Sequence, residues 1–321
     1  MKRLVECVPN FSEGRDASIV DAIVAAMREV PGAHLLAYES DPDHNRTVVT
    51  LAGEPEAVAE AAVRGVGKAA ELIDLTKHRG AHPRIGSADV VPFVPIEGVT
   101  PTECATLARE AGREIWKRHR VPVYFYEAAA LRPERVNLEN IRKGQFELLR
   151  EEAPRDAGRA PDIGGPALHP TAGATAVGAR KFLIACNFNL NTRDVGVAKT
   201  IAKAVRASNG GLPCVKAIGI YMAARNLAQV SVNLTDFEET SLSRLCESVK
   251  GEAGRLGVSI SGAEIVGLVP RRAVEAAAEL GMDLGVEFEN FSPATVLENR
   301  LEALAAGQGA DAPKDTLSAA K

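Results

Sequence analysis

The chain has few cysteines and few aromatic residues. Its 321 residues include five cysteines, an odd number, which are far apart and form no CxxC pair: Cys7, Cys104, Cys186, Cys214 and Cys246. This spacing does not favour a zinc ribbon or a disulfide framework and is typical of buried, reduced thiols in a cytoplasmic protein. Aromatic residues make up only 4% of the chain, so surfaces for ring stacking are scarce.

A strong net charge and long apolar runs are also missing. The 38 Lys and Arg residues nearly balance the 42 Asp and Glu residues, which argues against a nucleic-acid partner or a polybasic membrane anchor. No apolar stretch reaches the ~18 residues that suggest a membrane span. The start, MKRLVECVPNFSEG, turns polar too soon for a signal peptide. Neither GxxxxGK[ST] nor GxGxxG occurs, so nucleotide binding has no support. We expect a cytoplasmic protein that binds neither membranes nor nucleic acids.

Strand-like and helix-like segments occur twice in the same order, β-α-β-β-α-β. The first set comprises strand 2–9, helix 16–30, strands 33–38 and 46–52, a helix from Pro55 to about 73, and strand 89–95. The second comprises strand 181–188, helix 193–208 after a cap at Asn191-Thr192, strands 214–222 and 228–234, a helix to about 255 after a capping box at Thr235-x-x-Glu238, and strand 258–269. The repeat predicts an α/β (α+β) fold of two ferredoxin-like βαββαβ subdomains, with mixed sheets covered by helices.

We place the N-terminal subdomain at 1–178, the C-terminal subdomain at 179–305 and a flexible tail at 306–321. Between the repeats, Thr100-Pro101-Thr102-Glu103 predicts the start of a helix that runs to about His119. A strand is expected at 121–127 and a helix at 137–152. Residues 153–179 are rich in Gly, Pro and Ala, and a loop of that length is either a linker or functional.

The segment His78–Gly86 gathers two histidines and two arginines in one short loop. His78 and His82 have the i, i+4 spacing of zinc ligands on a helix, but Gly80 and Pro83 disfavour a helix there. A solvated basic loop remains an alternative. The favoured interpretation is an anion-binding site with an imidazole that moves protons, because histidine titrates near neutral pH.

Three further segments are candidates for ligand contact. In Asp41–Thr47 the first residues suit a turn, whereas Asn45-Arg46 at a strand start could bind a carboxylate. Asn10–Gly14 follows the first strand and could cap a helix or meet a ligand. The glycines and prolines of 165–175 would let a flat ligand approach the backbone, although flexible linkers share this composition.

Together these segments resemble the glutamate formimidoyltransferase family, the formiminotransferase domain of formiminotransferase–cyclodeaminase. The strings that carry the resemblance run in family order: VECVPNFSEGRD (5–16), DPDHNRTVV (41–49), HRGAHPRIGSADVVPFVP (78–95), NLENIRKGQFE (137–147), GARKFLIACNFNLNT (178–192) and NLAQVSVNLTDFE (226–238). They cover nearly the whole chain. No room for a cyclodeaminase domain follows residue 300, so we expect the stand-alone form.

The resemblance implies transfer of a formimino group between N-formimidoylglutamate and N5 of tetrahydrofolate in histidine degradation, by a homodimer that uses tetrahydrofolate as co-substrate and no metal. It places the general acid/base on His82. It implies substrate binding by Asn10, Glu39, Asn45, Arg46 and Arg84, and folate binding by Gly165, Pro166, Leu168, Pro170, Thr171, Gly173, Ala174 and Thr175. Animal members carry an aspartate where this chain has Glu39 and an aromatic residue where it has Ala172.

Three other functions stay open at this point. A transferase of formyl groups would use a similar acceptor and similar proton traffic. A non-catalytic folate sensor is compatible with ferredoxin-like units, which also occur in regulatory modules. A metallohydrolase would use the two histidines as ligands.

Overall fold

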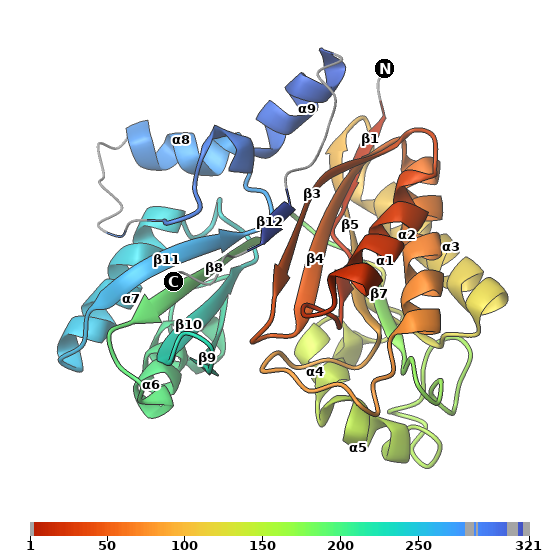
Figure 1. The fold of residues 1–321 in the computed structure, drawn as a ribbon, viewed down its shortest axis with the longest axis horizontal. Coiled ribbons are helices and arrows are strands. Elements are labelled where there is room, and N and C mark those ends of the chain that lie inside the picture. Colours follow the sequence, from red (N-terminus) through yellow and green to blue (C-terminus); the bar gives the residue numbers. More distant parts are fainter. Residues whose placement is uncertain (1–2, 280–285, 287, 307–313, 317–321) are drawn as a thin grey trace. The chain divides into compact units, whose positions relative to one another are not determined.

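The computed structural model describes residues 3–279, 286, 288–306 and 314–316. The chain divides into two units (Figure 1). Unit 1 consists of Met1–Arg180 and Ala312–Ser318, and unit 2 of Lys181–Asp311 and Ala319–Lys321. Most of the expected tail, 306–321, lies outside the described residues.

The first βαββαβ repeat forms the centre of the unit 1 sheet. It comprises β1 (Leu4–Cys7), α1 (Ala17–Arg28), β3 (Ala33–Asp41), β4 (Arg46–Gly53), α2 (Pro55–Leu72) and β5 (Ala88–Glu97). The four strands pair antiparallel in the order β3-β4-β1-β5, and the short β2 (Asn10–Phe11) pairs with β4 and β5. This is the strand order of a ferredoxin-like unit.

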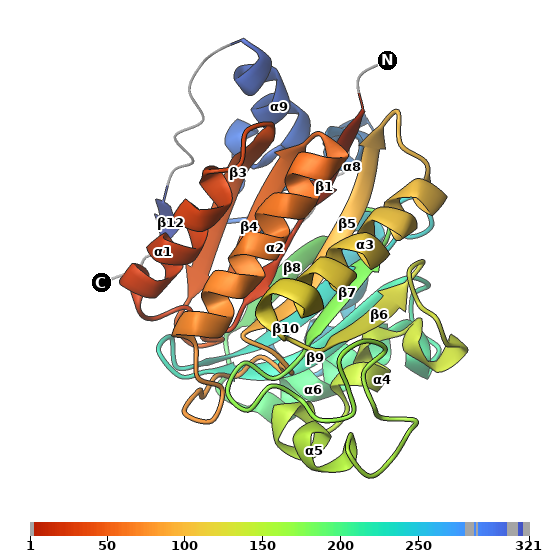
Figure 2. The ribbon, with the colours of Figure 1, turned by 90° about the vertical axis from the view of Figure 1, so that its right-hand side faces the viewer.

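Parallel strands extend this sheet on both sides. After β5, the chain forms α3 (Pro101–His119), β6 (Val123–Glu127) and β7 (Thr175–Ala179), and β7 pairs parallel between β5 and β6. At the other edge, β12 (Lys314–Thr316) pairs parallel with β3. Figure 2 shows α1, α2 and α3 side by side over one face of the sheet. Their apolar stripes, such as Val20, Ile23, Val24 and Met27 of α1, are buried against it.

Unit 2 repeats the order with β8 (Ile184–Leu190), α6 (Val195–Val205), β9 (Val215–Met222), β10 (Leu227–Leu234), α7 (Leu242–Arg255) and β11 (Ile260–Val266). Its strand order is β11-β8-β10-β9, and every pairing described is antiparallel. Two helices follow, α8 (Arg271–Glu279) and α9 (Leu297–Ala305). The predicted fold class is confirmed. Among the described residues, parallel strands extend the repeat in unit 1 alone, so the mixed sheet is that of unit 1.

The helix starts expected from capping patterns have mixed outcomes. The Thr100 box is confirmed, since Glu103 N donates to Thr100 Oγ1 at 3.2 Å and Thr100 N donates to Glu103 Oε2 at 2.8 Å. The Thr235 box is wrong: Thr235 Oγ1 donates to Cys214 O at 3.0 Å, and α7 begins at Leu242 with Ser241 as its N-cap. The cap of α6 is Asp194 rather than Asn191-Thr192.

The region between β6 and β7 differs from the predicted single helix and loop. It contains one short 3-10 helix (Pro133–Arg135) and two α-helices, α4 (Leu138–Arg142) and α5 (Gln145–Glu152). Gly144, with φ of 80°, separates the two helices. The part expected as loop ends in a buried strand, β7.

The five cysteines are free, and four of them are buried. Burial raises the pKa of the Cys104 and Cys246 thiols to about 12, so they stay protonated and unreactive near neutral pH. Within the described residues, every helix is too short or too polar to cross a bilayer.

Candidate active site

A pocket in unit 1 forms where the loop before β5 meets the start of β4. It is lined by Ser12, His44, Asn45, Arg46, His78, His82, Arg84 and Asp89. The fold thus brings together three segments that the sequence singled out separately: the end of β2, the turn between β3 and β4, and the loop 78–86. Gly80 permits this approach, because a Cβ there would lie 2.2 Å from His44 O.

His82 lies against Arg46, whose Nη1 donates to His82 Nε2. The ring of His44 is 6.0 Å away, centroid to centroid. Burial, followed by the positive charges of Arg46 and Arg142 and by His44, holds the pKa of His82 well below its usual 6.5. The imidazole is therefore neutral at physiological pH and can accept a proton.

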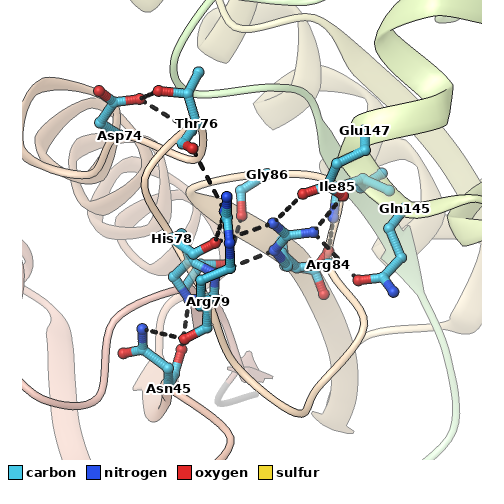
Figure 3. Close-up of polar contacts among 12 residues, drawn as sticks. Asn45, Asp74, Thr76, His78, Arg79, Arg84, Ile85, Gly86, Gln145 and Glu147 are labelled. Atoms are coloured by element: carbon cyan, nitrogen blue, oxygen red, sulfur yellow. Dashed lines mark hydrogen bonds and ion pairs between the residues drawn. The ribbon is translucent and has the colours of Figure 1, made fainter.

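Protein partners engage both ring nitrogens of His78 (Figure 3). Its Nε2 lies 3.0 Å from Asn45 O, and Arg84 Nε donates to its Nδ1 at 3.1 Å. Burial also lowers the pKa of His78. A neutral imidazole bonded on both sides ties the loop to the turn before β4, which makes His78 a structural residue.

Arg84 is held by an acidic partner from α5. Its Nη2 and Nη1 donate to Glu147 Oε1 and Oε2 at 2.6 and 2.7 Å, and Nη1 also lies 3.2 Å from Gln145 Oε1 (Figure 3). Asn45 is engaged as well: its Oδ1 accepts from Gly14 N at 2.9 Å, and its Nδ2 donates to Arg79 O at 3.0 Å. The polar atoms of Arg84 and Asn45 are thus engaged in hydrogen bonds that connect the segments around the pocket.

Two of the predicted substrate-binding residues lie away from the pocket lining. Asn10 is buried in β2, where its Nδ2 donates to Val8 O at 2.7 Å. Glu39 lies on β3, paired with Val48 of β4, and is also buried. Neither Asn10 nor Glu39 is among the described residues that line the pocket.

The Gly/Pro loop packs against the loop 78–86. His169 and Gly173 exchange backbone hydrogen bonds at 2.9 and 3.0 Å, Ser87 N donates to Ala172 O at 2.9 Å, and Ala174 N donates to Ile85 O at 3.0 Å. Gly173 has φ of 71°, and a Cβ there would lie 2.1 Å from Ile85 O. This position requires glycine for structural reasons.

The predicted folate residues divide by exposure. Gly165, Pro166 and Pro170 are exposed, and Leu168 and Thr171 are half-buried. Gly173, Ala174 and Thr175 are buried, as is Ala172. The accessible part of this loop is therefore 165–171.

A buried ion pair anchors the start of the Gly/Pro loop. Arg135 Nη1 lies 2.6 Å from Asp162 Oδ1, and the two side chains are only 3% and 2% exposed. The other carboxylate oxygen of Asp162 accepts from Phe125 N of β6 at 2.8 Å. The Arg135 guanidinium lies 5.0 Å from the ring of Tyr124. These contacts fix the loop to β6.

Sequence reasoning did not single out Asp89, which lines the pocket from β5. Its Oδ1 accepts from Ile85 N at 2.8 Å, and its Oδ2 pairs with Arg142 of α4. The available signal was an acidic residue inside an otherwise apolar strand, where a buried carboxylate needs a cationic partner. Ser12 and His44 belonged to segments that were noted, but no site role was assigned to them.

We expect Glu147→Ala to destabilise the protein by about 1.5–3 kcal/mol, because it leaves the buried Arg84 guanidinium without its bidentate carboxylate. Urea unfolding of the two proteins measures this difference. Glu151→Ala is the matched control, since Glu151 is exposed on the same helix and its loss should change stability by less than about 0.5 kcal/mol. Equal midpoints for both variants would contradict the role given to Glu147.

Two βαββαβ units and a pocket with a neutral histidine beside an arginine fit an enzyme that acts by acid–base chemistry on an anionic small molecule. Comparison with known families identifies which enzymes these are. The chain matches the N-terminal subdomain of the formiminotransferase domain over residues 4–180 and the model described as formiminotransferase domain over residues 185–288. It belongs to the formiminotransferase domain family.

Several curated proteins are similar to the chain. A glutamate formimidoyltransferase of Streptococcus pyogenes serotype M1 is 45% identical over 94% of this chain and 99% of its own length. Another, from Thermoplasma acidophilum, is 42% identical over 93% of this chain and 97% of its own. The formimidoyltransferase-cyclodeaminase of Mus musculus is 43% identical over 88% of this chain, a match that spans 53% of the mouse protein.

Proposed function

We propose that this protein is a glutamate formimidoyltransferase that moves the formimino group between N-formimidoylglutamate and N5 of tetrahydrofolate. The observation that carries the proposal is the position of His82 in the pocket, neutral and in contact with Arg46. Similarity to the S. pyogenes and T. acidophilum transferases over nearly the full length of all three chains supports it.

In the proposed reaction, N5 of tetrahydrofolate attacks the formimino carbon and forms a tetrahedral adduct. The bond from that carbon to the glutamate nitrogen then breaks. N5 must lose one proton and the departing nitrogen must gain one, so a single base that takes the proton and returns it balances the reaction. His82 fits this role because its lowered pKa leaves the ring unprotonated before attack.

For binding, we propose that the glutamate moiety is bound by Asn45, Arg46 and Arg84 of the pocket lining and by Asn10 and Glu39, which lie outside that lining. Arg84 would have to release Glu147 in order to bind a carboxylate directly. For folate, we propose contact with the exposed part of the Gly/Pro loop, while the buried Gly173, Ala174 and Thr175 hold that loop in place.

The test is transfer measured with purified protein, tetrahydrofolate and one of two donors, N-formimidoylglutamate or N-formylglutamate. We expect turnover with the formimino compound. Turnover with the formyl compound alone would replace the proposal with a formyltransferase. Folate binding without transfer from either donor would indicate a sensor.

The pH dependence of kcat/KM should show the titration of His82. Activity is lost as pH falls through the pKa of the base, and since that pKa is lowered, the acid limb should lie below pH 6.5. Burial and the positive charges of Arg46 and Arg142, followed by His44, lower the pKa of His82, and Asp89, His78 and Arg84 line the same pocket.

Arg46→Met is the informative variant for this profile. This variant should lower the maximum of kcat/KM. Because it removes a positive charge beside His82, it should also raise the pKa of His82 and move the acid limb toward higher pH. A wild-type limb at or above pH 6.5, or a limb that does not move in the variant, would contradict His82 as the titrating base.

We also propose that the protein works as a cytoplasmic homodimer in histidine degradation. The free cysteines support a reducing compartment, and the family resemblance supports the dimer and the pathway. Light scattering of the purified protein tests the dimer, which should show twice the mass of one chain.

A further inference from the structure

Arg142, at the last position of α4, meets the pocket through Asp89. Its Nη2 pairs with Asp89 Oδ2, and its side chain is 14% exposed. Asp89 lines the pocket together with Arg46 and His82. The charge of Arg142 acts on both of these residues, since it lowers the pKa of each. Arg142 therefore belongs to the surroundings of His82, although it lies 60 residues further along the chain.

Arg46 and Arg142 have unused hydrogen-bonding capacity. Among the described residues, the side-chain hydrogen bond of Arg46 goes to the neutral ring of His82, and that of Arg142 goes to Asp89. The Nε of each is buried without a hydrogen-bond partner in the described part of the chain. An unsatisfied buried donor costs free energy, so these groups are prepared for an acceptor that the free protein does not supply.

Arg84 provides the contrast. Its fork is closed on Glu147 and its Nε on His78, so it has no donor to spare. The two arginines with unpaired donors, Arg46 and Arg142, also repel each other: among charged groups, Arg142 has the largest effect on the pKa of Arg46, which it lowers. An anion placed between two guanidinium groups relieves their repulsion and satisfies their donors.

We propose that Arg142, together with Arg46, forms the subsite for a carboxylate of the glutamate moiety beside His82. The inference rests on the proposed function for the nature of the ligand. The two arginines hold the carboxylate, His82 handles the proton, and Asp89 keeps Arg142 in position. In the free protein, the ion pair of Arg84 with Glu147 holds the loop that carries His82.

Binding of N-acetylglutamate, measured by calorimetry, tests this without turnover. Charge-assisted hydrogen bonds contribute about 1.5–3 kcal/mol, so Arg142→Met should raise the Kd about 10- to 100-fold and leave tetrahydrofolate affinity unchanged. In assays the KM for the donor should rise and kcat should change little. Arg150→Met is the control: Arg150 is exposed on the neighbouring α5, and its loss should alter neither ligand's affinity.

Amide analogues separate a direct contact from a general loss of structure. Wild type should bind N-acetylglutamine or N-acetylisoglutamine, each lacking one carboxylate, more weakly than N-acetylglutamate. For the amide that removes the bound carboxylate, Arg142→Met should add no further loss, because the partner is already gone. Equal additional losses for all three ligands would overturn the inference.

Arg142→Met leaves Asp89 without its ion-pair partner and could prevent folding, so Arg142→Lys is a second test. Lysine keeps the ion pair but lacks the fork, so affinity for N-acetylglutamate should fall selectively but less. If this variant binds all ligands as wild type does, the inference is wrong. If wild type transfers the formimino group and neither variant affects donor binding, the inference fails while the proposed function stands. If wild type neither binds N-acetylglutamate nor transfers, the proposed function fails as well.

Discussion

His82→Ala should lower kcat by about 100- to 10,000-fold, the usual contribution of a positioned general acid/base. His78 offers no replacement, because both of its ring nitrogens are bonded, to Arg84 and to the Asn45 carbonyl. Tetrahydrofolate should still bind, since the accessible folate candidates, 165–171, do not include His82. Steady-state kinetics and equilibrium binding on the same preparation measure both quantities.

His34→Ala is the matched control for that experiment. His34 is exposed at the start of β3, so the same chemical change there should leave kcat within the error of wild type. A His82→Ala enzyme that retains more than about a tenth of wild-type kcat would fall outside the range expected for a general acid/base and would remove His82 from that role.

Arg135→Ala should destabilise the protein by about 3–5 kcal/mol, because it strands the Asp162 carboxylate in an interior that allows it almost no solvent. Unfolding by chemical denaturant measures this loss in the free energy of unfolding. The loss should also loosen the segment 157–163, so tetrahydrofolate affinity should fall at temperatures where the protein is still folded.

An exposed ion pair provides the comparison. Lys117 and Glu114 on α3 lie 3.2 Å apart and are 74% and 44% exposed, so Lys117→Ala should cost less than about 1 kcal/mol. The double variant Arg135→Met with Asp162→Leu should recover much of the single-variant loss. If Arg135→Ala unfolded at the same denaturant concentration as Lys117→Ala, the anchoring role of the pair would be refuted.

The sequence was sufficient for the repeated βαββαβ order because each element carries its own signal. Amphipathic spacing marked α1, proline at the first position marked α2, and the Thr100 box marked α3. Such signals are local, and here the tertiary structure agrees with them. The Thr235 box failed because that hydroxyl satisfies the carbonyl of Cys214 across the chain, a partner that no local pattern reveals.

Strand β7 was missed for a different reason. Its sequence, Thr-Ala-Val-Gly-Ala, has the small residues of a loop, yet every position is buried between β5 and β6. Small side chains are needed there because the sheet is crowded: a Cβ on Gly178 would lie 2.5 Å from the ring of Tyr126. Packing demands of this kind depend on neighbours that sequence periodicity does not show.

The residues proposed for proton transfer and substrate binding, His82 and Arg46, could be found from the sequence, whereas the residues that contact them in the fold could not. His82 and Arg46 stood out as a histidine in a basic loop and an arginine at a strand start. Their supports, Asp89, Arg142 and Glu147, come from a strand and two short helices and acquire a role only through contacts made in three dimensions. The structure also separates arginines that look equivalent in sequence, since Arg84 is fully engaged and Arg46 is not.

Formimino transfer can be tested most directly by following the carbon itself. With purified protein, tetrahydrofolate and N-formimidoylglutamate labelled with carbon-13 in the formimino group, nuclear magnetic resonance should show the label moving to N5 of the folate. One glutamate should be released for each group transferred. Label that stays on glutamate, or that appears as a hydrolysis product independent of folate, would contradict the account.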